Sequence, residues 1–180
     1  MRKALLIAAW ALVLAASAAH AIGPKTGFRT GINTAYVMGT SDNGAYNNWS
    51  VDLTLGGQLA SFIYIGAGGG LELFTQMNRD VPTPLDIPVF GELRLYLPTK
   101  IVVHPYVSGR GGYAFNVSRD ACRWRGAPIL DVSVGVEIVK FLNLSVGYNA
   151  HFYSKDALPD EYYTYYGTAS GFVARLGLRF

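Results

Sequence analysis

The stretch from Leu130 to Ile138, LDVSVGVEI, decides the fold, because apolar and polar residues alternate through it without a break. Successive side chains of a β-strand point to opposite faces, whereas a helix would repeat its apolar residues about every 3.6 positions. The stretch therefore predicts a strand with one apolar face and one face that carries Asp131, Ser133, Gly135 and Glu137.

The same period of two recurs in seven further segments, which makes eight in all. They fall at about 28–38, 49–59, 63–73, 89–97, 106–116, 144–152 and 172–180. Each is close to the roughly 9–11 residues that a tilted strand needs to cross a bilayer. Longer polar links at 39–48, 76–87, 118–127 and 154–168 alternate with tighter ones near 60–62, 98–103 and 139–143. This organisation predicts an all-β fold, an eight-stranded antiparallel up-and-down transmembrane β-barrel with both ends of the chain in the periplasm.

The beginning of the chain predicts an export signal. Arg2 and Lys3 precede an apolar run that ends at Ala19, and Ala19-His20-Ala21 has the small-x-small pattern of a cleavage site. We expect residues 1–21 to be a signal peptide and residues 22–180 to form the barrel domain, in the outer membrane of a Gram-negative cell. The apolar run is shorter than the roughly 20 residues of a membrane-spanning helix.

Composition argues against several classes of function. The formal net charge is +3, and Arg2 and Lys3 supply two of those charges, so the mature chain gives no electrostatic reason to expect nucleic acid as a partner. Cys122 is the one cysteine, so no intrachain disulfide is possible, and no spacing of ligands suggests a metal or a cofactor. Gly66-Ala-Gly-Gly-Gly70 lacks the strand–loop–helix context of a nucleotide-binding loop.

Alternation by itself leaves two barrels open, a soluble one with its apolar face inside and a membrane barrel with the faces reversed. The polar faces favour the second, since they carry glycine, serine, threonine and asparagine rather than the dense mixed charge of a soluble surface. Their scattered charges are balanced, and buried charges must be paired. We therefore expect an interior ion-pair plug made of Arg29, Asp52, Glu72, Glu92, Arg94, Arg110, Asp131, Glu137, Arg175 and Arg179. Aromatic residues near the strand ends, at positions 28, 49, 152, 172 and 180, fit the girdles at a membrane interface.

Three stretches carry a resemblance to a known class. The closing GFVARLGLRF, from Gly171 to Phe180, resembles the C-terminal insertion signal that the barrel-assembly machinery reads, with Phe172, Leu176, Leu178 and Phe180 as its apolar positions. The segments IPVFGELRLYL at 87–97 and PYVSGRGGYAF at 105–115 are similar to strands of small OmpA/OmpX-like barrels of the Bacteroidetes style. The resemblance implies fold and location, with membrane lipid and lipopolysaccharide as surroundings. It does not imply an activity, because such barrels include adhesins, anchors and enzymes.

His151 raises the alternative of an enzyme that modifies lipid A. It lies near the long-loop end of its strand, with Ser154 and Asp156 just beyond. Ser154 falls on the opposite face from His151, and the His-x-Ser spacing of one such deacylase is absent because residue 153 is a tyrosine. We therefore interpret His151 as a polar interior residue and expect no catalytic residues.

The long links between the predicted strands carry the remaining candidate functional residues. Tyr162, Tyr163, Tyr165 and Tyr166 are candidates for contact with an extracellular ligand, because tyrosine gives contact area at low entropic cost. The alternative is that they form an aromatic girdle where the strands leave the membrane. Cys122 lies among arginines in the third long link, a setting that could meet phosphate groups of lipopolysaccharide. A small-solute channel is a further alternative, although a filled eight-stranded barrel leaves little passage. We expect a structural or surface-interaction barrel and not an enzyme.

Overall fold

The computed structural model describes residues 24, 26–40, 47–75, 85–97, 99, 101–117, 126–138, 141–153 and 168–180. The predicted signal peptide (1–21), Cys122 and the four loop tyrosines at 162, 163, 165 and 166 lie outside these residues. Eight strands make up the fold: β1 (Gly27–Gly39), β2 (Asn47–Ala60), β3 (Ile63–Thr75), β4 (Leu85–Tyr96), β5 (Val103–Asn116), β6 (Ala127–Ile138), β7 (Leu142–Phe152) and β8 (Thr168–Arg179).

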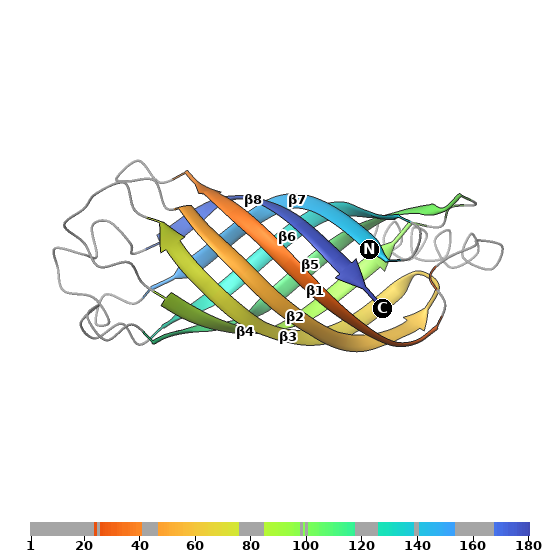
Figure 1. Cartoon of the computed structure of the whole chain (residues 1–180), viewed down its shortest axis with the longest axis horizontal. Helices are drawn as coiled ribbons and strands as arrows, with labels where there is room; N and C mark the ends of the chain where they lie inside the picture. Colours follow the sequence, from red (N-terminus) through yellow and green to blue (C-terminus); the bar gives the residue numbers. More distant parts are fainter. Residues whose placement is uncertain are drawn as a thin grey trace, which may run out of the picture.

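The strands form a closed barrel in chain order, as the alternation predicted (Figure 1). Each strand pairs antiparallel with the next, and β8 pairs antiparallel with β1. Thr30 and Phe180 complete this last seam, since each donates its backbone N–H to the carbonyl of the other, at 3.0 and 2.9 Å. Closure leaves no unpaired strand edge, which is the condition for a sheet to lie in hydrocarbon. In the described part of the chain, no helix is long and apolar enough to span a membrane.

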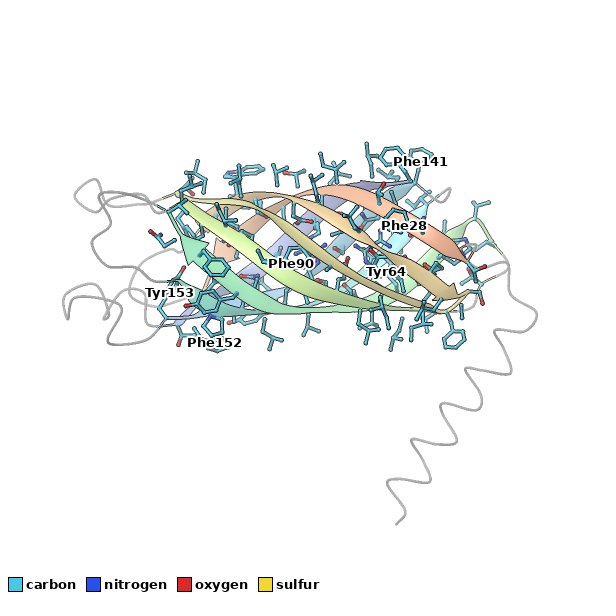
Figure 2. The ribbon with its side chains drawn as sticks, turned by 90° about the horizontal axis from the view of Figure 1, so that it is seen from below. Phe28, Tyr64, Phe90, Phe141, Phe152 and Tyr153 are labelled. Atoms are coloured by element: carbon cyan, nitrogen blue, oxygen red, sulfur yellow. The ribbon has the colours of Figure 1, made fainter. Side chains whose placement is uncertain are left out.

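The barrel is apolar outside and polar inside. On β2, for example, Leu53 is 60% exposed while its neighbour Asp52 is 4% exposed. The aromatic residues expected at the interfaces all project outward, among them Phe28, Phe152 and Phe180. Figure 2 shows the same division, with Phe141 and Phe152 outside the wall at opposite ends of the barrel and Tyr64 within it.

Seven of the eight strands begin earlier than the sequence predicted, and at β2 and β4 the difference adds polar residues to the interior. β2 starts at Asn47 and β4 at Leu85, so Asn48 and Asp86 are inward-facing strand residues rather than loop residues. Their backbones pair in register with β1 and β5, Asn48 with Val37 and Asp86 with Asn116. The prediction was wrong for two different reasons. The start of β2 consists of two asparagines, so no alternation marks it, whereas β4 alternates from Leu85 onward but carries the apolar Pro88 on its inward face.

Inward glycines make room for the long side chains of the interior. A Cβ built on Gly135 would lie 2.6 Å from Cζ of Tyr106, and one built on Gly66 would meet the hydroxyl of Tyr64. Real Cβ atoms do not approach other atoms so closely, so these positions accept only glycine while the two tyrosines keep their places.

Candidate functional site: the filled interior

One carboxylate lies at the centre of the interior. Glu92, on β4, accepts contacts from three guanidinium groups, those of Arg94 at 2.7 Å, Arg110 at 3.1 Å and Arg179 at 3.3 Å. The four side chains are at most 5% exposed. The strand period explains the first of these contacts, because residues 92 and 94 point to the same face. The other two come from β5 and β8, so Glu92 joins three strands.

Further ion pairs surround this centre. Arg110 also contacts Asp52 at 3.1 Å, which extends the cluster to β2. Arg175 on β8 pairs with Asp131 on β6 at 2.8 Å. At the short-turn end Arg29 on β1 holds both carboxylate oxygens of Glu137 on β6, at 2.8 and 3.2 Å. Several of these pairs reach across the lumen, so the interior is crossed by charged contacts rather than lined by them.

Tyrosine side chains complete the packing around the arginines. The guanidinium of Arg179 lies 4.1 Å from the ring centre of Tyr64, and that of Arg94 lies 4.8 Å from the ring centre of Tyr106. Tyr96 links the two clusters, because its hydroxyl donates to Glu137 at 2.8 Å and accepts from Arg179 at 3.2 Å. Cation–π contacts strengthen when their groups are buried, and these arginine and tyrosine side chains are buried.

The loop end of the interior has a different character. Glu72 and Asp86 are directly opposite each other on β3 and β4, and neither forms an ion pair with an arginine in the described part of the chain. Glu72 lies 3.4 Å from Nε2 of His151 on β7. Asp86 accepts hydrogen bonds from Asn116 at 2.7 Å and from the Tyr153 hydroxyl at 3.0 Å. Figure 2 shows Tyr153 at this end of the barrel.

This arrangement corrects two features of the predicted plug. Equal numbers of acids and arginines were expected, but Asp86 adds an inward acid with 0% exposure. Glu72 was expected in the ion-pair plug, yet the titratable side chain that it contacts is the imidazole of His151. The parity of β4 could have revealed Asp86, since residues 86, 90, 92 and 94 share one face. No sequence signal could have joined His151 to Glu72, because β7 and β3 are not neighbours in the barrel.

The structure places the other predicted residues plainly. The remaining nine charged residues of the predicted plug are buried inside the barrel and pair with one another. Phe172, Leu176 and Leu178 lie on the outer face of β8, Phe180 directly follows that strand, and all four are exposed. Among the described residues, no group of three or more histidine, cysteine, aspartate or glutamate side chains is placed to hold a metal ion.

Taken together, a closed antiparallel wall, an apolar exterior and a charged, filled lumen define a transmembrane β-barrel. The chain is similar in structure to Neisserial surface protein A (NspA), whose crystal structure aligns with a TM-score of 0.59 over 86% of this chain and 97% of that one. Sequence identity in that alignment is 15%, so the likeness concerns the fold. No protein-family model matches the chain, and no curated protein is similar to it in sequence.

Proposed function

We propose that this protein is a closed outer-membrane barrel that anchors its four long inter-strand links at the cell surface and has no large pore. The carrying observation is the set of ion pairs that cross the lumen, above all the three arginines on Glu92. Because the lumen is filled in this way, we infer that an extracellular ligand would bind the four long links, at 40–46, 76–84, 117–126 and 153–167. NspA, which shares the fold, is a surface protein by its name.

Conductance separates this proposal from a small-solute channel. We expect the purified barrel in a planar lipid bilayer to show no steady, large conductance steps, since the side chains of β4, β5 and β8 fill the lumen. Stable large steps from the wild-type protein would contradict the proposal of a closed barrel.

Loop deletions test the surface-interaction part. Removing residues 160–166, which contain the four tyrosines, should leave the folded, heat-modifiable form intact while lowering adherence to an extracellular matrix, glycan or phage partner. Removing residues 41–46 from the first link is the matched control, because that link has one tyrosine, Tyr46. If cells that lack the whole protein adhere just as wild-type cells do, the surface-interaction role fails while the barrel stands.

The end of β8 supports a proposal about assembly. Phe180 is 72% exposed on the outer wall, and its backbone closes the seam with Thr30. We expect Phe180→Ala to lower the amount of barrel that reaches the outer membrane in cells, through weaker recognition by the barrel-assembly machinery. The same variant should still refold in detergent, since the backbone pairing of the seam does not need the ring.

A lipid A-modifying enzyme is less well supported, because His151 is fully buried in the lumen and contacts Glu72 rather than facing lipid. Lipid A would reach the barrel from the outer face, which His151 does not share. Mass spectrometry of lipid A from wild-type and deletion strains tests the alternative, and identical spectra are expected. The more specific OmpA/OmpX-like resemblance is likewise a proposal, which rests on the strands at 87–97 and 105–115.

A further inference from the structure

Asp86 brings together side chains from the roots of three long links. It is the second residue of β4, close behind the link at 76–84. One of its carboxylate oxygens accepts a hydrogen bond from Asn116 Nδ2 at 2.7 Å, and the other accepts from the Tyr153 hydroxyl at 3.0 Å. Asn116 ends β5 just before the link at 117–126, and Tyr153 directly follows β7 and begins the link at 153–167.

The hydrogen bond from Tyr153 to Asp86 joins strands that are not neighbours. β4 and β7 are separated in the barrel by β5 and β6. β6 begins at Ala127, which pairs with Ala114 on β5, two residues before Asn116. Asp86 and Asn116 pair with each other in register, so both lie beyond the first residue of β6. The hydrogen bond therefore connects the wall on the two sides of the point where β6 begins.

Both partners of this hydrogen bond are buried. Asp86 is 0% exposed and Tyr153 is 4% exposed. The ring of Tyr153 belongs to an apolar cluster inside the loop end, together with Phe74 of β3, and it stacks on the imidazole of His151 with 6.1 Å between ring centres. Tyr153 is thus turned into the lumen, whereas the preceding Phe152 faces outward at the same end of the barrel (Figure 2).

A carboxylate suits this position because both of its oxygens face donors. Hydrogen bonds to a carboxylate are stronger than those between neutral groups, and an amide in its place would offer one acceptor oxygen instead of two. The main chain reinforces one side of the arrangement, since the backbone N–H of Val117 donates to the carbonyl of Leu85 at 2.9 Å. The ends of β4 and β5 are therefore held to each other by main chain and side chain, and Tyr153 ties the end of β7 to both.

From this geometry we propose that Asp86 is a positioning residue that makes the loop ends of β4, β5 and β7 open as one unit. We call the three side chains of Asp86, Asn116 and Tyr153 the clasp. It fixes the roots of three links relative to one another, which is what a binding surface made from more than one link requires. The clasp lies in the wall and does not depend on any ligand, so it can fail while the proposed surface role stands.

Hydrogen exchange followed by mass spectrometry tests the clasp on the whole barrel in lipid vesicles. Tyr153→Phe removes the hydroxyl and keeps the ring. Because the lost hydrogen bond has a carboxylate acceptor, we expect amide exchange to become roughly tenfold to hundredfold faster at 150–153, and also at 85–87 and 114–117 across the lumen. Asp86→Asn should accelerate the same three segments. The double variant should not exceed the larger single effect, because both substitutions break one shared contact.

Tyr96→Phe is the matched control. It removes a buried hydroxyl that donates to a buried carboxylate, that of Glu137 at 2.8 Å, but at the short-turn end. Exchange at the three loop-end segments should stay as in wild type, and heat-modifiable gel mobility verifies that each variant is folded. Faster exchange at 150–153 alone would make Tyr153 a local contact and overturn the proposal. Unchanged exchange in Tyr153→Phe, additive effects in the double variant, or the same loop-end acceleration in Tyr96→Phe would overturn it as well.

Discussion

The substitution Glu92→Gln tests whether charge pairing stabilises the filled interior. It keeps the size and shape of the side chain but removes the negative charge that three arginines share. Glutamine keeps one acceptor oxygen but puts an NH2 group in place of the second, so the change removes the charge together with one of the two acceptors that the arginines use.

The structure limits how large the effect should be. Arg110 keeps its contact with Asp52 at 3.1 Å, and Arg179 keeps the Tyr96 hydroxyl at 3.2 Å. Arg94 has no second carboxylate among the described ion pairs, so it loses its charged partner entirely. Removing one partner of a buried pair costs about 3–5 kcal/mol, and we expect a loss of that size rather than three times as much.

Urea unfolding of the barrel in lipid vesicles, followed by tryptophan fluorescence and gel mobility, measures the free energy of unfolding. Glu72→Gln is the control, because it is the same substitution at a buried, inward position that lacks an arginine partner in the described residues. We expect the control to change the free energy of unfolding by about 1 kcal/mol or less. If Glu92→Gln is as stable as wild type, or if both variants lose equal stability, the view that arginine pairing stabilises the lumen is wrong.

Two further pairs of variants test the wall. Gly135→Ala places a Cβ 2.6 Å from Cζ of Tyr106 and should lower the free energy of unfolding in vesicles by about 1–3 kcal/mol. Gly111→Ala is the control, because a Cβ there faces open space and should leave the free energy of unfolding unchanged. Equal effects of the two variants would show that crowding inside the barrel does not determine its stability. Val134→Arg, in the lipid-facing part of β6, should cost about 2–4 kcal/mol in the same assay. Phe28→Arg, at the end of β1, should cost about 0–1 kcal/mol, and a reversed order would contradict the placement of these residues in the bilayer.

Much of the wall was predictable because strand structure is local. A period of two assigns each residue to one face without any knowledge of its partners, so Asp52, Glu92 and Arg175 could be placed inside from their immediate neighbours alone. The number of strands, their order and the membrane-facing side followed from the same pattern. The predicted segment stopped short at Val89, after Pro88, and so missed Asp86 on the same inward face of β4.

By itself, the sequence determined which side chains point inward; only the tertiary structure decided which of them meet. Closure of the sheet brings β4 opposite β8 and β3 opposite β7, and the tilt and stagger of the strands fix the height at which their side chains lie. For this reason Glu92 contacts Arg179. For the same reason Glu72 contacts His151 and not an arginine. Such contacts join residues that are distant in the chain and on different strands, and no local repeat encodes that distance.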